Sequence, residues 1–158
     1  MDMAQSSKKF ILTPEGLTKL KGEYDQLVNV KRSQIIKRIK IAREFGDLAE
    51  NSEYDAAKEE QTLLELRITQ LEEVLSKAQI IDKTPKNGFV VIGSTVVVET
   101  DGQTDEFMIV GTVEANPAKK KISNESPVGA ALLGARVGEV IEVMTPIIRA
   151  KYKILEIK

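Results

Sequence analysis

"SEYDAAKEEQTLLELRITQLEEVLSK", residues 52–77, sets the architecture of the N-terminal half of this chain. Its interior positions recur at alternating spacings of three and four residues, which is the pattern of a coiled-coil seam. The residues on this seam are Tyr54, Ala57, Gln61, Leu64, Ile68, Leu71 and Leu75. The stretch therefore predicts a long amphipathic helix that packs one face against a second helix.

The second helix is predicted immediately upstream. "LTPEGLTKL", residues 12–20, begins with a hydroxyl N-cap, then a proline at the first helical position and an acid in the first turn, as helix starts commonly do. Apolar residues follow at similar spacings, but the pattern slips past Lys31 before it resumes, which indicates a stutter in this arm. The residues on this face are Leu17, Leu20, Tyr24, Leu27, Ile35, Ile39 and Ala42.

Each arm is about 30 residues long, and the connection between them, at residues 46–51, is short. Two helices joined in this way fold back on each other as an antiparallel hairpin. At a rise of 1.5 Å per residue the hairpin is roughly 45 Å long. The sequence thus predicts a narrow helical hairpin with one isolated tip.

Composition excludes several kinds of site. The chain has 158 residues with no cysteine and no histidine, so disulfides, cysteine nucleophiles and thiolate zinc sites are ruled out. Any metal must be held by oxygen, which favours Mg²⁺, Ca²⁺ or Mn²⁺. No apolar run approaches the roughly 20 residues of a membrane span, and "MDMAQSSKKF" lacks the apolar core of a signal peptide. We therefore expect a cytoplasmic protein without a membrane partner.

The net charge of −1 hides an uneven distribution. Residues 31–43 hold six cations and no acid, whereas residues 44–82 hold eleven acids and three cations. The six cations are Lys31, Arg32, Lys37, Arg38, Lys40 and Arg43. One arm is basic and the next is acidic, so the average charge is a poor guide to binding partners.

The C-terminal half lacks the helical periodicity of the first half and contains short β-branched runs instead. "DKTPKNG", residues 82–88, carries a proline and an Asn-Gly pair without periodicity, which indicates a linker at 83–88. Short β-branched runs follow at residues 89–92, 95–99, 106–110, 140–144 and 151–157, and Asp101-Gly102 is a hairpin turn signal. Ser126 and Pro127 start a short helix that Gly134 ends.

These features predict an α+β protein of two domains. Residues 1–82 form the coiled-coil hairpin with its tip at about 46–51, residues 83–88 form the linker, and residues 89–158 form a small antiparallel sheet with one helix. This division follows from the change in periodicity near Asp82.

Asp47 and Glu50 are the candidate functional residues at the tip. Their spacing is that of a capping box, in which Asp47 caps the second helix and Glu50 reaches back. A competing box at residues 52–55 would free both carboxylates to converge on one hard cation. Two carboxylates alone make a poor Mg²⁺ site, so such a tip would complete a site that belongs to another protein. Arg43 and Lys58 flank the tip, where cations contact phosphate.

Three stretches resemble the bacterial Gre transcription elongation (transcript cleavage) factors, most closely their GreA branch. "AREFGDLAENSEYDAAKEEQ" (42–61) is similar to the tip signature of the family, and "ISNESPVGAALLGARVGEVIEV" (122–143) to its C-terminal signature. "LTPEGLTKLKGEYDQL" (12–27) resembles the usual start of the first helix. The likeness runs from about residue 10 to the end of the chain.

The resemblance implies a C-terminal domain of FKBP-like fold that binds the rim of RNA polymerase, while the hairpin enters the secondary channel. It implies that Asp47 and Glu50 hold a catalytic Mg²⁺ jointly with the polymerase and position the attacking water. The polymerase's own active site then cuts backtracked RNA, so the chain itself is no enzyme and binds no cofactor tightly.

By the same resemblance, Arg43 and Lys58 contact the RNA near its 3′ end, and Tyr54 and Asn51 support the tip. We expect a monomer.

The sequence departs from the family at two places and leaves three alternatives open. Ala49 stands where a lysine is common, and "TPIIR", residues 145–149, lacks the paired glycines expected after Thr-Pro. The alternatives are a Gre-like inhibitor that fills the channel without promoting cleavage, an FKBP-like peptide-binding protein, and a plain coiled-coil scaffold.

Overall fold

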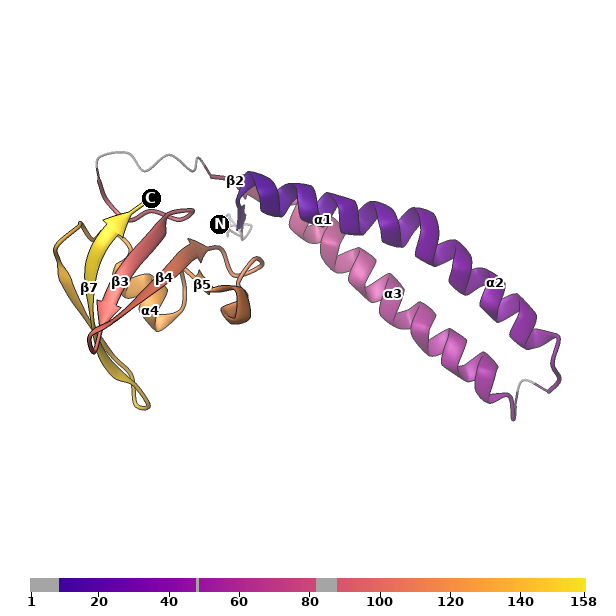
Figure 1. Cartoon of the computed structure of the whole chain (residues 1–158). Helices are drawn as coiled ribbons and strands as arrows, with labels where there is room; N and C mark the ends of the chain where they lie inside the picture. The colour runs from indigo at the N-terminus through magenta and orange to yellow at the C-terminus, as the bar shows by residue number, and fades with distance from the viewer. Residues whose placement is uncertain (1–8, 48, 82–87) are drawn as a thin grey trace, which may run out of the picture. The chain divides into compact units, whose positions relative to one another are not determined.

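The computed structural model describes residues 9–47, 49–81 and 88–158. It confirms an α+β protein with an N-terminal helical hairpin and a C-terminal β-domain that carries one short α-helix (Figure 1). Contacts between Cα atoms divide the chain into two compact units: Leu17–Lys77 forms one, and the residues up to Gly16 join those from Ala78 onward in the other. In the described part of the chain, every helix is too short or too polar to cross a bilayer.

The hairpin consists of α1 (Pro14–Gln26), a π-helical turn η1 (Leu27–Lys31), α2 (Arg32–Arg43) and α3 (Ser52–Ser76). The two arms run antiparallel and side by side (Figure 1). The predicted seam between them is confirmed: the buried cluster consists of Ile35, Ile39, Ala57, Leu64 and Ile68, with Tyr24, Leu27, Val28 and Tyr54 half-buried around it.

Charged side chains pair across the two flanks of this seam. Arg32 donates two hydrogen bonds to Glu65 at 2.9 and 3.0 Å, and Arg67 donates two to Glu23 at 2.7 and 3.0 Å. The bonds from Arg32 lower the pKa of Glu65, and those from Arg67 lower the pKa of Glu23. Because both carboxyl pKa values are lowered by folding, the stabilisation is present at neutral pH and is lost as the pH falls through the lowered values. These pairs are largely exposed, so their contribution is modest.

The π-helical turn explains the slip in the first arm. Leu27 and Ile35 are eight residues apart, whereas a regular seam repeats every seven. Leu27 and Val28 are both half-buried against the core cluster, so the seam passes from one to the next. The amide of Arg32 donates to the carbonyl of Leu27, five residues back rather than four. The interruption predicted in this arm is therefore the insertion of a single residue, which one widened turn absorbs.

The opposite arm contains no matching insertion. Tyr24 Oη donates to Glu72 at 3.0 Å, and Arg32 donates to Glu65. The two donors are eight residues apart and their acceptors seven. Eight residues of one arm thus cover the length of seven in the other, and the π turn keeps both halves of the hairpin in register.

The C-terminal sheet contains β3 (Thr95–Thr100), β4 (Gln103–Val110), β5 (Lys121–Ser123), β6 (Val140–Met144) and β7 (Arg149–Ile157), in the order β5-β4-β3-β7-β6. It is mixed rather than antiparallel, because β5 pairs with β4 in parallel. The turn η2 (Pro117–Lys119) precedes β5, and α4 (Pro127–Leu132) follows it. The core consists of Val90, Val96, Val98, Ile109, Leu132, Ala135 and Ile154.

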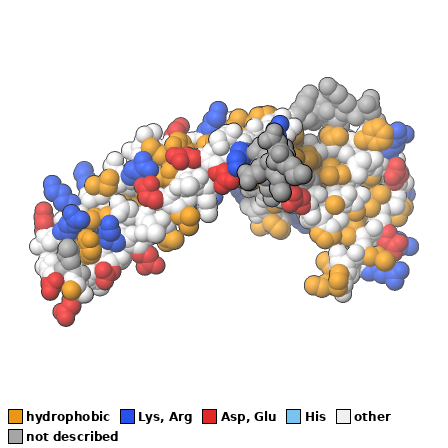
Figure 2. All heavy atoms as spheres, turned by 180° about the vertical axis from the view of Figure 1, so that it is seen from behind, with side chains coloured by type: hydrophobic (Ala, Val, Ile, Leu, Met, Phe, Trp, Pro, Cys, Tyr) orange, Lys and Arg blue, Asp and Glu red, His pale blue; other side chains and the backbone are white. Residues whose placement is uncertain are grey.

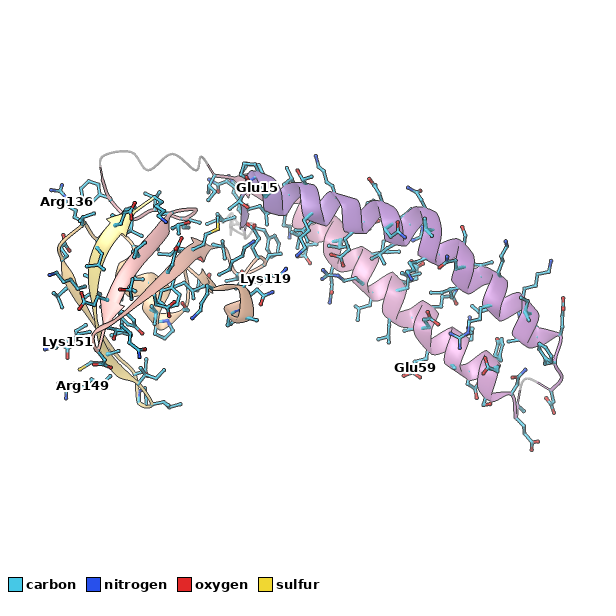
Figure 3. All side chains as sticks on the ribbon, viewed as in Figure 1. Glu15, Glu59, Lys119, Arg136, Arg149 and Lys151 are labelled. Carbon is cyan, nitrogen blue, oxygen red and sulfur yellow. The ribbon has the colours of Figure 1, made fainter. Side chains whose placement is uncertain are left out.

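Two of the local features predicted in this domain are present, and one predicted strand is not. Asp101 and Gly102 both have positive φ, at 51° and 76°, which confirms the predicted β3–β4 hairpin turn. Ser126 Oγ accepts from the amide of Gly129, as predicted for the N-cap of α4. The predicted strand at residues 89–92 is wrong, because Phe89 forms only an isolated bridge with Arg136. The Arg136 guanidinium instead lies 4.2 Å from the centre of the Phe89 ring (Figure 3).

The β6–β7 turn shows why paired glycines are dispensable here. The amide of Thr145 donates to the carbonyl of Ile148 at 2.7 Å, and Thr145 Oγ1 accepts from the amide of Ile148 at 2.7 Å. No residue of this turn has a positive φ. A side chain is therefore tolerated at every position, and Ile147 is 93% exposed.

Two three-residue strands were not predicted. β1 (Phe10–Leu12) and β2 (Ala78–Ile80) pair in parallel and lie directly before and after the helical hairpin in the chain. The predicted cap at Thr13 is confirmed, since its Oγ1 accepts from the amide of Gly16 at 3.0 Å. The predicted linker at 83–88 falls almost wholly outside the described residues, so the domain boundaries at 82 and 89 stay predictions.

Glu114 completes the start of α1. Its carboxylate accepts from the amide and the hydroxyl of Thr13 at 2.8 and 2.6 Å. Thr13 is only 2% exposed, so water cannot replace these bonds. Glu114 thus satisfies two buried donors at once.

Deletion of Asn29 is expected to leave the hairpin at least as stable as the wild type. The deletion moves Ile35 to within seven residues of Leu27, so the seam continues through a regular α-helix. Deletion of Lys37 is the control, because it rotates Ile39 and Ala42 off the seam by about 100° and costs about 2–4 kcal/mol. Urea unfolding followed by circular dichroism measures both. Equal destabilisation by the two deletions would contradict the single-insertion interpretation.

Glu114→Ala is expected to destabilise the C-terminal unit by about 1–3 kcal/mol, because it leaves two buried donors of Thr13 without acceptors. Glu139→Ala, which removes an exposed acid from the same unit, is the matched control and should change the free energy of unfolding by less than about 0.5 kcal/mol. Thermal unfolding of both variants tests the assignment, and equal stability of the two would refute it.

Candidate functional site at the hairpin tip

Gly46 ends the first arm. The amides of Glu44 and Phe45 still donate to Ile41 and Ala42, at 3.1 and 3.2 Å, as one last helical turn. Gly46 then takes a φ of +132°, in a region that L-residues rarely adopt. No atom crowds the position of a Cβ at this glycine, so it is the backbone angle that requires glycine. The predicted end of the helix at Gly46 is confirmed.

Asn51, rather than an acid or a serine, caps the second arm. Its Oδ1 accepts from the amide of Tyr54 at 3.1 Å, and its Nδ2 donates to the carbonyl of Ala42 at 2.6 Å. One side chain thus starts α3 and ties it to the end of α2. Both predicted capping boxes are wrong: Asp47 lies before the cap, and Ser52 is already the first residue of α3.

The sequence does contain a signal for this cap. Asparagine ranks with aspartate and serine among the preferred N-cap residues. Within six residues the sequence offers three possible N-caps for the second helix, which are Asp47, Asn51 and Ser52, and residue preference alone does not distinguish them. The bond from Asn51 to Ala42 decides between them, and spacing along one helix does not reveal a contact across the tip.

Asp47 and Glu50 are left exposed by this arrangement. Asp47 Oδ1 accepts from the amide of Ala49 at 3.1 Å, and the Asp47 carbonyl accepts from the amide of Glu50 at 3.3 Å. These two hydrogen bonds tie Asp47 to Ala49 and Glu50. Within the described ranges, neither carboxylate forms an ion pair, so both are available to a ligand.

The described residues form no complete metal site. No cluster of three or more aspartate, glutamate, histidine or cysteine side chains is close enough to hold an ion in this part of the chain. Mg²⁺ usually takes one or two protein carboxylates together with water and phosphate oxygens. Asp47 and Glu50 fit a share of such a site and do not fit a site of their own.

The predicted RNA-contacting cations lie on the two arms beside the tip. The Arg43 guanidinium is 5.9 Å from the centre of the Tyr54 ring, within the range of a cation–π interaction. Tyr54 is itself half-buried against the hairpin core. Lys58 Nζ donates to Gln61 at 3.1 Å and makes no described contact with either acid. The structure thus brings Arg43 and Tyr54 together, but it does not join Lys58 to the tip carboxylates.

A hollow beside the tip was missed by sequence reasoning. It has a volume of about 230 Å³ and is lined by Arg38, Ile41, Ala42, Phe45 and Glu53. Apolar side chains also show between charged ones along the hairpin surface (Figure 2). The sequence does hold a signal for it: Phe45 follows Glu44 and precedes Gly46 and Asp47, outside the periodic seam. A large apolar residue at such a position indicates an exposed apolar surface.

Comparison with known proteins agrees with this architecture. A family model described as the N-terminal part of a transcription elongation factor matches residues 10–80, and a GreA/GreB C-terminal model matches residues 85–158. The transcription elongation factor GreA of Clostridium acetobutylicum is 51% identical over 155 residues, which are 96% of this chain and 98% of that protein. GreA of Caldanaerobacter subterraneus subsp. tengcongensis is 52% identical over 155 residues, with 96% and 99% covered.

Among solved structures, Gfh1 of Thermus thermophilus, a GreA factor homolog, is 31% identical, with 96% of this chain and 99% of that chain covered and a TM-score of 0.44. The two family models together extend over nearly the whole described chain, and the GreA relatives match over nearly their full length. This chain belongs to the GreA/GreB family of transcription elongation factors.

Proposed function

We propose that this protein is a transcript cleavage factor. Its hairpin tip enters the secondary channel of RNA polymerase and stimulates the polymerase's own cleavage of backtracked RNA, which rescues arrested complexes. One observation carries the proposal: Asp47 and Glu50 are exposed at the end of the hairpin, while Asn51 takes the capping role that would otherwise occupy one of them.

The chemistry of the tip explains why it must act on another protein. A Mg²⁺ ion shared with the polymerase and the RNA phosphate would activate water and stabilise the developing charge. Asp47 and Glu50 supply two oxygen donors, and the turn from Asp47 to Glu50 presents them on one short segment. The protein alone is then no nuclease, since the remaining ligands belong to its partner.

The cations beside the tip serve the RNA in this proposal. Arg43 is exposed, and its contact with Tyr54 restricts where the guanidinium lies. A guanidinium held in this way offers several donors to a phosphate near the RNA 3′ end. Lys58 adds a second exposed cation on α3. Ala49 contributes no charge, so the RNA contact depends on Arg43 and Lys58.

The C-terminal domain provides the docking surface for the polymerase rim. It contains an apolar cavity of about 480 Å³. The side chains around the cavity are Ala115, Pro117, Lys121, Ile122, Ser123, Ser126, Pro127, Val128, Val143, Thr145 and Ile148. A cavity of this size with few polar groups is suited to apolar side chains of another protein.

The alternatives are less well supported. An FKBP-type isomerase needs an aromatic-lined pocket for proline, and no aromatic residue lines the C-terminal cavity. An inert coiled-coil scaffold has no need of two exposed acids at the tip. The cleavage assay below separates a cleavage factor from a channel inhibitor, since both would place the tip in the channel. The likeness of the C-terminal domain to the FKBP fold stays a prediction.

Asp47→Ala and Glu50→Ala are each expected to slow RNA cleavage in halted, backtracked complexes by about 100-fold, the usual cost of removing one group that stabilises a transition state. Binding to the polymerase should change by less than about twofold, because the docking surfaces are intact. Glu59→Ala is the matched control: this acid projects from α3 on the side away from α2 (Figure 3) and should leave cleavage unchanged.

Short 3′ RNA fragments, resolved on a gel in the presence of Mg²⁺, provide the measurement. Full activity of both tip variants would disprove the role of the carboxylates. Fragments released from naked RNA without polymerase would disprove action in trans. Wild-type protein that binds the polymerase without releasing fragments would favour the inhibitor.

A further inference from the structure

The hollow beside the tip exposes apolar side chains that the hairpin itself does not use. Phe45 is 78% exposed and Ile41 is 54% exposed, while Ala42 forms a buried floor between them. Exposed apolar surface next to polar side chains commonly marks a contact with another molecule. Phe45 is only two residues from Asp47, so a contact here would act directly on the position of the tip.

The hollow and the cations proposed for RNA lie on opposite flanks of the hairpin. Ile41 and Arg43 are two positions apart on α2, which places them about 200° apart around the helix axis. Arg43 leans against Tyr54 on its flank, whereas Ile41 and Phe45 line the hollow with Arg38. A nucleic acid on the Arg43 flank would leave the hollow free for a different ligand.

Charge at the hollow disfavours a phosphate. Its one cation, Arg38, is already paired with Glu60 and, at 3.6 Å, with Glu53. Glu53 itself lines the hollow and would repel a phosphate. With the guanidinium compensated, the hollow offers an apolar centre inside a neutralised charged rim, which is the usual anatomy of a contact that seats one apolar side chain.

The size of the surface disfavours a second copy of this chain. A stable dimer buries about 800 Å² on each partner, far more than the side chains of Phe45 and Ile41 provide. The hollow is therefore suited to be one anchoring point within a larger contact. Its occupant is a single leucine-, isoleucine- or phenylalanine-like side chain of a polypeptide.

We propose that this hollow seats an apolar side chain of the protein wall that the inserted tip meets, and that Phe45 and Ile41 are positioning residues for Asp47 and Glu50. The proposal rests on the proposed function, in which that wall belongs to the secondary channel of RNA polymerase. Anchoring one flank two residues from the acids fixes where their carboxylates lie. A displacement of 1 Å at a reacting group can lower a rate by about 100-fold.

Cleavage of backtracked RNA at saturating factor concentration tests the proposal. Phe45→Ala is expected to lower the maximal rate about tenfold and Ile41→Ala about threefold, with circular dichroism spectra unchanged. Ile36→Ala is the matched control, because Ile36 lies on the same helix with 53% exposure and outside the hollow; it should cleave like the wild type. Phe45→Leu should stay within threefold of the wild type, since the pocket requires an apolar group and not a ring.

The result identifies the occupant as well. If Phe45→Tyr is active while Phe45→Leu is as slow as Phe45→Ala, the ring stacks on a nucleobase and the proposal is wrong. Benzoylphenylalanine at position 45 should crosslink to a polymerase polypeptide on irradiation; a crosslink to RNA instead would also refute it. Phe45→Ala with the wild-type maximal rate would show that the exposed ring is inert.

Failure of the proposed function is distinguishable from failure of this inference. If the wild type binds polymerase without stimulating cleavage, the proposed function fails. Equilibrium binding and crosslinking of the same variants then still decide whether the hollow contacts a protein: a weaker complex for Phe45→Ala than for Ile36→Ala supports it, and equal binding overturns it.

Discussion

The hairpin depends on one line of apolar contact between two helices. Ile35 and Ile39 on one arm meet Ala57, Leu64 and Ile68 on the other, and these five residues form the buried cluster of the hairpin. Each arm therefore has one buried apolar stripe, and its remaining surface is mostly polar, with exposed exceptions such as Ile36 and Ile41. Because the seam is the main source of hydrophobic stabilisation, a shift of one residue in either arm would expose it. The π turn at Leu27–Lys31 is the local adjustment that keeps it closed.

Sequence patterns predicted the parts of the fold whose stabilising contacts are periodic or local. The 3-4 spacing of α3, the Asp101-Gly102 turn and the Ser126 cap each follow from neighbours within a few residues. β1 and β2 were missed because three residues carry no recognisable period and each strand is stabilised by a partner far along the chain. The slip in the first arm was visible, but only backbone hydrogen bonds show that a single residue is absorbed.

The candidate site, too, could be predicted from the sequence only in part. The identity of the exposed acids could be read from the sequence, since Asp47 and Glu50 follow the glycine that ends the first arm and lie outside the periodic seam. Their freedom to bind could not, because it depends on Asn51 reaching the carbonyl of Ala42 across the tip. The hollow beside Phe45 was hidden for a related reason: its lining comes from both arms. The proposed role of the acids comes from the family likeness, and the geometry excludes their competing role as helix caps.

The parallel pairing of β1 with β2 has a consequence for how such proteins can be rebuilt. Ile81 donates to the carbonyl of Leu12 at 3.0 Å, so the chain leaves for the hairpin and returns from it at adjacent strands, which in a sheet lie about 4.8 Å apart. The whole hairpin thus forms the connection between the two parallel strands β1 and β2. A hairpin with a different tip could be exchanged between Thr13 and Lys77 without disturbing the pairing of β1 with β2. The same C-terminal domain could then carry hairpins with different functions.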